Sequence, residues 1–464
     1  MRKKYYFLLL MGLLLVFVAA CNQETSSNEN NEEAKETRLE NLNESGMPIV
    51  NEPITLRFFA GKHANNLDDY NEVRLWQEYE KMTNITIDWE LVPFDGLDER
   101  RNLALAGNEN LPEAFYTPLM RNDDLFKYGE QGTFLELTDL IEEHMPNLSS
   151  ILDEYPEIRK GITFPDGGIY GFPLILSPEF ESVHIGSKLW LRADWLEKLG
   201  MDIPETTDDF YEYLKAIKET DLNENGEADE IPYGAYRVVR LKEWLKGSFG
   251  LSNRGFKNGT IDIDPETDEL RFYPIADESK QLLQYLNKLF EEELIAPNIY
   301  SIERQQNLAF GSQGLYGSTV EPHPASSFGP DSGDFIGVAP FEGPNGDRLA
   351  SYVNAPISWL GGMIITKENE YPEATARWMD YFYGEEGRRM FFMGIEDESY
   401  EVTDDGEVRY KEIITNNPDG LTEPEARARF VTYGGGGYPG IVDQRYFQGS
   451  ENMPESLEAM ESIR

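Results

Sequence analysis

Cysteine is nearly absent from this chain of 464 residues, in which Cys21 is the only one. An internal disulfide is therefore excluded. Histidine is scarce as well, and no two of His63, His144, His184 and His323 are sequence neighbours. The sequence contains no HExxH zinc motif, no GxSxG nucleophile elbow and no GxxxxGK(S/T) phosphate loop. It therefore shows no recognisable catalytic or nucleotide-binding motif, and we do not expect an enzyme.

Positive charge is the second shortage. The sequence has 41 Lys and Arg residues against 85 Asp and Glu residues, which gives a formal net charge of −44. Nucleic acids and anionic lipid surfaces are bound through clustered Lys and Arg, so we expect neither as a partner. Solubility is a sufficient explanation of the acidity. Carboxylates are so numerous that counting does not exclude a glycosidase pair, but no pair stands out from the others.

The N-terminus has the order of a secretory signal peptide. Basic residues at 2–4 precede an apolar run over 5–17, which is too short to span a bilayer comfortably, and small residues at 18–20 stand before Cys21. The Val-Ala-Ala-Cys segment resembles the lipobox of bacterial lipoproteins, whose cysteine is lipid-modified. We therefore expect a signal peptide over 1–20 and a lipid anchor on Cys21 at the outer face of the cell membrane. An ordinary signal peptide with an incidental cysteine is the alternative.

The residues after the signal peptide are too polar to fold by themselves. Positions 22–51 contain few apolar residues and many Asn, Glu and Ser, and so bury too little apolar surface to offset the entropy of ordering them. We expect a disordered tether over 21–51. The body from Pro53 to Arg464 is too long for one typical domain, so two lobes are expected.

The start of the body predicts a parallel sheet. Alternating apolar residues indicate strands over 53–59 and 85–89, and helical spacing indicates a helix over 73–82 between them. A strand, a helix and a strand within this length form a βαβ unit. Further along, Thr206 and Asp209 have the spacing of a capping box. A helix over 279–293 is expected to bury three apolar side chains, namely Leu283, Leu286 and Phe290. The fold class is therefore α/β in two lobes.

The loop Asp221–Glu230 has the pattern of a cation site. Oxygen-bearing side chains stand at alternate positions, and Gly226 at the sixth position permits a sharp turn. A hard cation such as Ca²⁺ requires six to eight oxygens on such a loop. The EF-hand pattern fails at the twelfth position, which is Pro232, so Glu230 would replace the usual glutamate. The expected ligands are the Glu227 carbonyl and the side chains of Asp221, Asn223, Asn225, Asp229 and Glu230. An ordinary polar turn is the alternative, and the ion would be structural.

Several segments spread over the chain resemble one family. They are Asp166–Pro173, Leu189–Gly200, Asp221–Pro232, Asn307–Gly311 and Trp378–Gly387. With the lipobox and the tether, they resemble the oligosaccharide-binding solute-binding lipoproteins of ABC importers, including the alginate- and pectin-fragment-binding proteins. In the alginate-binding relatives the equivalent of the 221–230 loop holds calcium, so the resemblance also implies a structural Ca²⁺ here.

The resemblance implies a two-lobed, periplasmic-binding-protein-like fold of type II, with the ligand in a cleft between lobes that close on it. The expected first lobe is 52–183 plus 355–385, and the expected second lobe is 184–354 plus 386–464. The crossings between them are expected near 180–188 and 350–366. Relatives usually continue well past Tyr438-Pro439-Gly440, whereas this chain ends at Arg464, so a truncated second lobe is one expectation.

Sugars are bound by aromatic faces and by planar polar groups. The expected ligand-binding residues are Trp190, Arg192, Trp244, Glu321, His323 and Trp359, with Asn65 and Asp69 after the first strand as weaker candidates. For each Trp the alternative is a place in the core, where this residue is often largely buried. The resemblance leads to the hypothesis of a monomeric, lipid-anchored receptor that delivers an oligosaccharide to the permease subunits of an importer. A secreted polysaccharide hydrolase and a surface sensor or adhesion lipoprotein are the alternatives.

Overall fold

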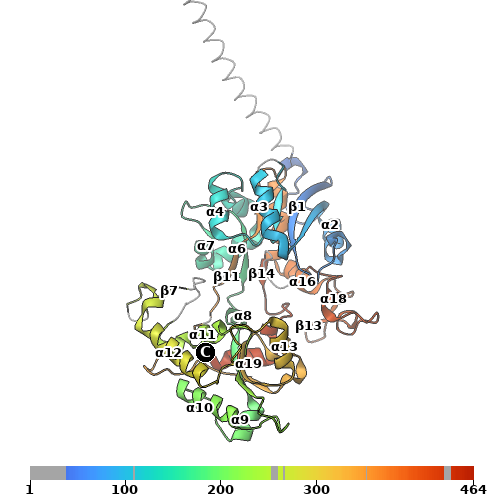
Figure 1. The fold of residues 1–464 in the computed structure, drawn as a ribbon. Coiled ribbons are helices and arrows are strands. Elements are labelled where there is room, and N and C mark those ends of the chain that lie inside the picture. The colour runs from blue at the N-terminus through green and yellow to red at the C-terminus, as the bar shows by residue number, and fades with distance from the viewer. Residues whose placement is uncertain are drawn as a thin grey trace, which may run out of the picture. The chain divides into compact units, whose positions relative to one another are not determined.

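A computed structural model describes residues 38–107, 110–251, 260–264, 267–351, 353–432 and 440–463. The chain forms two compact units, whose elements are labelled in Figure 1. The first unit contains the described residues up to Pro173 and those from Trp359 to Gly440. The second contains Leu174–Ser358 and the described residues from Ile441 onward. The chain therefore passes between the units three times.

A six-stranded sheet has the order β14-β4-β11-β3-β1-β2. The strands are β1 (Ile54–Lys62), β2 (Ile85–Pro93), β3 (Ala114–Tyr116), β4 (Phe172–Leu176), β11 (Ile357–Ile365) and β14 (Gly440–Val442). Strand β1 pairs in parallel with β2 and β3, and β3 pairs antiparallel with β11. Helix α2 (Arg74–Thr83) connects β1 to β2, so the predicted βαβ unit is confirmed. The three passages between the units lie in β4, β11 and β14.

Aromatic side chains fill the core of the first unit between α2 and α15 (Pro372–Asp380). The indoles of Trp76 and Trp378 stack with centroids 5.5 Å apart, and Phe58 of β1 meets Trp378 edge-on at 5.4 Å. The other helices of this unit are α3 (Leu97–Gly107), α4 (Asn122–Glu130), α5 (Thr138–His144), α6 (Pro146–Glu154), α7 (Pro156–Ile162), α16 (Glu385–Met393), α17 (Glu412–Thr415) and α18 (Glu423–Arg427). The remaining elements are the hairpin β12 (Tyr400–Val402) and β13 (Val408–Tyr410), and the 3-10 turns η1 (Tyr70–Glu72), η2 (Phe94–Gly96) and η6 (Tyr381–Tyr383).

The described residues before β1 form part of the first unit. Ile49 and Val50 are each 1% exposed, and Leu42 pairs with Val50 in an isolated bridge. The prediction of a tether through Asn51 is therefore wrong for residues 38–51. Composition missed this packing because the segment gains its stability from contacts with α2 and α15 rather than from its own few apolar residues.

The predicted division into lobes also differs from the observed units. The described residues of 386–440 were expected in the second lobe but belong to the first unit. Backbone hydrogen bonds from Arg74 N to Arg429 O and from Leu75 N to Phe430 O, both 3.0 Å, hold this segment against α2. A crossing near 180–188 was also expected, but these residues lie within the second unit. The passage after Ser358 lies within the predicted range 350–366.

The second unit contains a four-stranded sheet in the order β10-β5-β9-β6. The strands are β5 (Lys188–Arg192), β6 (Ile231–Tyr233), β9 (Tyr316–Glu321) and β10 (Phe335–Gly337). Strand β5 runs antiparallel to β9 and β10, whereas β6 is parallel to β9. A separate hairpin joins β7 (Ile261–Ile263) to β8 (Leu270–Phe272). With parallel strands, antiparallel strands and many helices, the α/β fold class is confirmed.

Helices bury one face of this second sheet. Leu189, Leu191 and Val320 belong to a core cluster with side chains from α10 (Thr207–Lys218), α11 (Val239–Leu245) and α12 (Asp277–Glu291). The other helices are α8 (Glu181–His184), α9 (Ala193–Leu199), α13 (Arg304–Ser312), α14 (Pro324–Phe328) and α19 (Pro454–Ile463). The 3-10 turns are η3 (Lys246–Phe249), η4 (Tyr273–Ile275), η5 (Pro330–Ser332) and η7 (Ser450–Asn452). No helix within the described ranges has the length and apolar character required to cross a membrane.

Two local predictions for this unit had different outcomes. The capping box before α10 is confirmed: Asp209 N donates to Thr206 Oγ1 and Thr206 N donates to Asp209 Oδ2, each at 3.0 Å. The predicted inward face of α12 is wrong for Leu283, which is 57% exposed. The buried leucines of α12 are Leu282, Leu286 and Leu289, so the apolar stripe is rotated by about one residue from the predicted one.

Candidate functional site

Three predicted ligand residues meet at one end of the sheet in the second unit. Trp190 Nε1 donates to the carbonyl oxygen of Glu321 at 2.9 Å, and the rings of Trp190 and His323 meet edge-on with centroids 4.9 Å apart. All three side chains are buried. Trp190 also clusters with Phe335 of β10 and Ala459 of α19, so its ring faces are covered by protein. Within this unit these three residues pack the end of the sheet.

Glu321 is held by a residue that the sequence analysis did not select. Arg240 of α11 pairs with the Glu321 carboxylate at 2.7 Å and donates to Val320 O at 3.2 Å. Ser327 Oγ donates to the same carboxylate at 3.2 Å. Burial nevertheless raises the pKa of Glu321, because desolvation outweighs the attraction of Arg240. Arg240 is the more accessible partner, with 31% of its side chain exposed.

His323 is oriented by its own chain. Its Nδ1 accepts from Ala325 N at 3.2 Å, so the proton of the neutral ring belongs on Nε2, which lies 3.7 Å from a Glu455 oxygen of α19. Burial lowers the pKa of His323, and Lys188 adds to that effect. Burial also lowers the pKa of Lys188 to about 8. Its ammonium donates to Ser182 Oγ and Ile185 O. The polar side chains at this end of the sheet are therefore buried, and most of their hydrogen-bonding groups have partners within the second unit.

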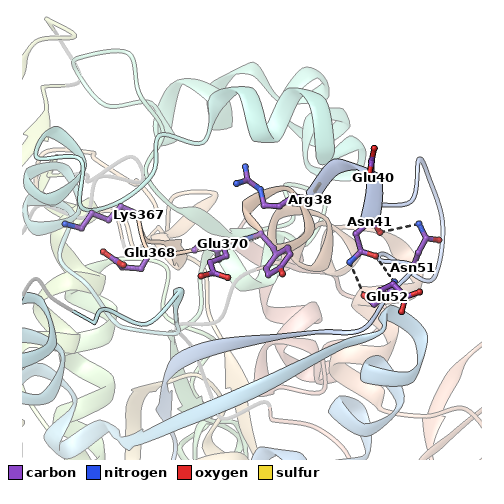
Figure 2. Close-up of a pocket in the computed structure, with 10 residues that line it drawn as sticks. Arg38, Glu40, Asn41, Asn51, Glu52, Lys367, Glu368 and Glu370 are labelled. Carbon is purple, nitrogen blue, oxygen red and sulfur yellow. Dashed lines mark hydrogen bonds between the residues drawn. The ribbon is translucent and has the colours of Figure 1, made fainter. Parts of the chain in front are cut away.

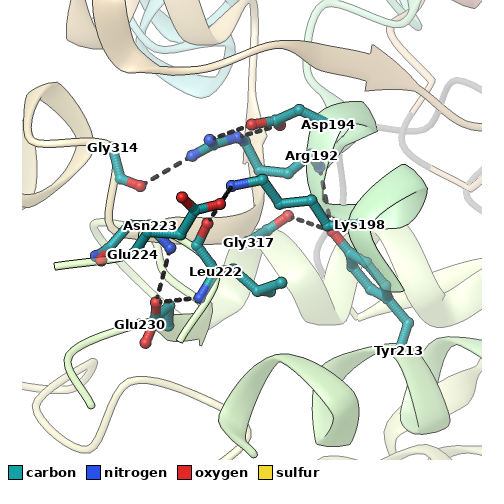
Figure 3. Close-up of polar contacts among 10 residues, drawn as sticks. All are labelled: Arg192, Asp194, Lys198, Tyr213, Leu222, Asn223, Glu224, Glu230, Gly314 and Gly317. Carbon is teal, nitrogen blue, oxygen red and sulfur yellow. Dashed lines mark hydrogen bonds and ion pairs between the residues drawn. The ribbon is translucent and has the colours of Figure 1, made fainter. Parts of the chain in front are cut away.

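Arg192 is likewise bonded to neighbouring groups of the second unit. Its guanidinium makes two 2.7 Å hydrogen bonds to the carboxylate of Asp194 and donates to Gly314 O at 2.9 Å (Figure 3). It also lies over the Trp195 ring, 4.3 Å from the ring centroid. These contacts join the end of β5 to α9 and to the turn before β9. The structure thus gives Arg192 a structural role in this unit.

The remaining predicted ligand residues lie apart. Trp244 is buried in the core cluster of the second unit. Trp359 is half-buried on β11. Asn65 and Asp69 are exposed after β1, where Asp69 accepts from Asn71 N at 2.8 Å and caps η1. The structure therefore does not bring these four together within either unit.

The first unit has a candidate surface that the sequence analysis did not find. The parallel strands β1, β2 and β3 end side by side, and open α/β sheets bind ligands at the carboxyl ends of such strands. His63 follows β1 and meets Phe94, which follows β2, with ring centroids 6.2 Å apart. Thr117 and Leu119 follow β3. The signal that would have found them is their position directly after parallel strands.

The side-chain oxygens of the 221–230 loop accept hydrogen bonds from other groups of the same loop. Gly226 N donates to Asp221 Oδ2 at 2.9 Å, and Asn223 Nδ2 and Asn225 Nδ2 donate to Asp229 Oδ1 at 2.9 and 3.2 Å. Glu227 N donates to Asn225 Oδ1 at 2.7 Å, and the Glu227 carbonyl has no partner among the described residues. The predicted side chains Asn223 and Asn225 thus meet at Asp229, whereas Asp221 is bonded to the main chain of the same loop.

Glu230 and Lys198 fix the base of this loop. Glu230 Oε1 accepts from Leu222 N at 2.7 Å and from Asn223 N at 3.1 Å. Lys198 of α9 reaches across to Leu222 O at 2.7 Å and Glu224 Oε1 at 2.8 Å, as Figure 3 shows. Since Leu222 is buried in the core, the loop is anchored to the body of the unit.

The donor set of the loop suits a hard cation only if amide and main-chain oxygens take part. In the described part of the chain, no three His, Cys, Asp or Glu side chains are grouped to hold a metal ion. The loop supplies carboxylates from Asp221 and Asp229 and amides from Asn223 and Asn225. This all-oxygen composition fits Ca²⁺ rather than a transition metal.

A polar cavity of about 990 Å³ lies in the first unit, where the segment before β1 meets the residues after β11 (Figure 2). Asn41 Nδ2 donates to Glu52 O at 3.0 Å along its edge. Its charged lining residues are Arg38, Glu40, Glu52, Lys367, Glu368 and Glu370. Four carboxylates against two cations make it a poor site for an anion. None of the predicted ligand residues lines it.

Residues 65–389 match a family model described as bacterial extracellular solute-binding protein. The chain is 31% identical over 345 residues to the fructooligosaccharide ABC transporter substrate-binding protein FusA of Streptococcus pneumoniae. This match covers 72% of the chain and 62% of FusA, so the chain spans less than two thirds of that relative's length. FusA is named as a binding protein and not as an enzyme.

Two further comparisons extend this result. The chain is 28% identical over 380 residues to the lipoprotein LipO of Bacillus subtilis, which covers 76% of this chain and 68% of LipO. A solved structure of an EF-hand mutant of S. pneumoniae FusA in complex with fructo-nystose has a TM-score of 0.69. It is 26% identical, and the match covers 88% of this chain and 82% of that one. The two-unit α/β fold therefore agrees with that of a solved solute-binding protein.

Proposed function

Because the chain belongs to the bacterial extracellular solute-binding protein family, we propose that it captures an oligosaccharide outside the cell and delivers it to an ABC importer. The observation that carries this proposal is the similarity to FusA, whose name states a fructooligosaccharide as its substrate. The buried state of the polar cluster in the second unit agrees with binding rather than chemistry, since Glu321 is already engaged by Arg240.

Calorimetric titration with sugars tests this proposal. Fructo-nystose serves as the uncharged probe and trigalacturonate as the acidic probe. We expect one-to-one binding of an oligosaccharide, a rise in melting temperature with ligand concentration, and no product after long incubation. Failure of every sugar in a broad neutral and acidic panel to bind contradicts the proposal, as does steady cleavage of a bound glycan.

We also propose that Cys21 carries a lipid anchor. Cys21 lies outside the described residues, so the support is the order of basic, apolar and small residues before a lone cysteine. The relative LipO is named a lipoprotein, which agrees with this proposal. The protein would then remain at the outer face of the membrane as a monomer near its importer.

A structural calcium ion in the 221–230 loop is the third part of the proposal. Asp221, Asn223, Asn225, Asp229, Glu230 and the Glu227 carbonyl would supply the oxygens. The convergence of Asn223 and Asn225 on Asp229 supports a common centre. The solved EF-hand mutant of FusA adds support, because its description assigns an EF-hand to that relative. The ion would neutralise carboxylates and fix the connection from α10 to β6.

A further inference from the structure

The turn after β3 has an unusual backbone. Thr117 and Leu119 both have φ of 48°. Left-handed backbone is uncommon outside glycine, and for a β-branched residue it is an outlier. Thr117 also precedes Pro118, which favours extended backbone in the residue before it. The other non-glycine residues with positive φ in the described chain are Asn84, Asn110, Glu224, Asp268, Glu293 and Asp397. The turn is therefore strained, and such strain persists only where the surroundings enforce it.

Arg101 of α3 is the main restraint on this turn. Its guanidinium donates to Pro118 O at 2.6 Å and to Leu119 O at 3.2 Å, and it pairs with Asp98 at 2.9 Å. The side chain of Arg101 is buried, so its bond to Pro118 O is shielded from water, whereas Asp98 is exposed. Charge-assisted hydrogen bonds of this kind are stronger than neutral ones. One arginine thus holds two successive carbonyl groups of the turn.

Strand β1 provides a second restraint. Thr117 Oγ1 donates to Gly61 O at 2.9 Å, and Thr117 N donates to Gly362 O at 2.8 Å. A Cβ on Gly61 would lie 2.5 Å from Thr117 O and 2.6 Å from the Phe94 ring. Only glycine fits there, so the turn and the Phe94 ring are pressed against the end of β1.

The restrained turn leaves one accessible main-chain donor unused. The N–H group of Leu119, a partly buried residue, donates to no group in the described chain. Phe94 and Leu119 are only partly buried and lie over the same core cluster. An unused amide donor beside a half-exposed ring suits a sugar, which offers hydroxyl oxygens and an apolar ring face.

The charge of the surface indicates which sugar fits. Lys62 at the end of β1 is paired with Asp68, and Arg101 is buried and paired with Asp98. Arg121, which follows the turn, is paired with Asp123, so each of these three cations of the described chain already has a carboxylate partner. An uncharged sugar therefore meets this edge at a lower desolvation cost than a uronate.

We propose that Arg101 is a positioning residue that holds Thr117-Pro118-Leu119 in its left-handed conformation, so that the Leu119 amide and the Phe94 ring bind an uncharged oligosaccharide. This inference rests on the proposed oligosaccharide-binding function and specifies its substrate class. Arg101 acts through the turn and does not itself touch the ligand.

The test distinguishes a loss of binding from a loss of folding by asking whether a second substitution restores the affinity. Fructo-nystose and trigalacturonate are titrated by calorimetry well below the melting temperature of each variant. We expect Arg101→Met to weaken fructo-nystose binding about tenfold or more, because the released turn relaxes towards extended backbone. Adding Thr117→Gly to Arg101→Met should restore most of the affinity without restoring the melting temperature, since glycine adopts positive φ without restraint.

The neighbouring Arg100→Met is the matched control, since Arg100 is exposed on the same helix and pairs with Glu90. It should leave the affinity unchanged. If Arg101→Met does not fold, Arg101→Lys replaces it. A lysine retains the charge but has one nitrogen, whereas Arg101 holds the two carbonyls with Nη1 and Asp98 with Nη2. The positioning role is overturned if the wild type and the Arg101 variants bind fructo-nystose equally well. It is also overturned if Thr117→Gly does not restore the affinity of the Arg101 variant. Binding of trigalacturonate alone overturns the uncharged class, and binding of neither probe or any other sugar overturns the proposed function itself.

Discussion

Arg377 of α15 donates a 2.9 Å hydrogen bond to the carbonyl oxygen of Gly46, in a segment whose composition predicts a tether. The same guanidinium also bonds Asn43 O, and Arg38 pairs with Glu373 at 3.3 Å. Two arginines therefore fasten the residues before β1 to the helix that follows β11. The folded body therefore includes the residues from Arg38 onward and does not begin near Pro53.

This attachment predicts the effect of shortening the chain. A chain beginning at Pro53 loses buried Ile49 and Val50 and leaves Arg377 and Glu373 without their partners. We expect the first unit to lose about 3 kcal/mol or more of its free energy of unfolding relative to a chain beginning at Arg38. Urea unfolding of the two chains measures the difference. Equal midpoints would show that the segment contributes nothing to stability.

The lipid anchor predicts a change of location. Replacing the only thiol by Cys21→Ser removes the atom that accepts the lipid, so the protein should leave the membrane fraction or stay unprocessed. Cell fractionation and the mass of the mature N-terminus measure this. Ser26→Ala, in the same polar segment, is the control and should remain attached. A serine variant that is processed and retained like the wild type contradicts the anchor.

The calcium proposal predicts a melting temperature that depends on chelator. Removing the ion leaves the carboxylates of Asp221 and Asp229 without a counter-charge, so a chelator should lower the melting temperature of the wild type. Asp221→Ala combined with Asp229→Ala should abolish that response. Glu224→Gln is the matched control, because Glu224 lies on the same loop but bonds Lys198. Identical melting curves with and without chelator, and no calcium in the purified protein, would leave an ordinary polar turn.

Lys188 predicts a pH dependence of stability. Burial lowers its pKa from the ordinary 10.5 to about 8, so the folded state disfavours the charged form. Between these two pH values the unfolded chain binds more protons, and the contribution of Lys188 to stability rises with pH. At pH 7, keeping Lys188 charged in the folded state lowers the free energy of unfolding by roughly 3 kcal/mol.

Lys188→Met should therefore stabilise the protein at pH 7, and its advantage should shrink as the pH rises from 8 to 10. The free energy of unfolding at several pH values measures this. Lys280→Met, at an exposed position of α12, is the control and should show no such trend. A Lys188→Met advantage that does not depend on pH would mean that the buried lysine is uncharged or compensated at pH 7.

Patterns among residues close in sequence were sufficient to predict some features of the fold. Alternating apolar residues identified β1 and β2, and the spacing of Thr206 and Asp209 identified the cap of α10, because strand period and capping geometry are set by near neighbours. The alternate oxygens of the 221–230 loop selected Asn223, Asn225 and Asp229, whose side chains are in contact, and the calcium itself stays a prediction. The apolar stripe of α12 was misplaced by about one residue, because the choice between Leu282 and Leu283 depends on the direction in which the helix meets the core.

Tertiary contacts decided the rest. The sequence by itself determined the α/β class, the acidity that disfavours polyanionic partners, and the lone cysteine after an apolar run. It did not determine that Trp190 and Arg192 are covered, because a tryptophan or arginine near a strand has the same local pattern in a core and in a binding site. The strained turn at Thr117 was also invisible, because nothing near it in sequence favours a left-handed threonine. Only Arg101, Gly61 and Gly362, which the fold brings together from distant positions, enforce it.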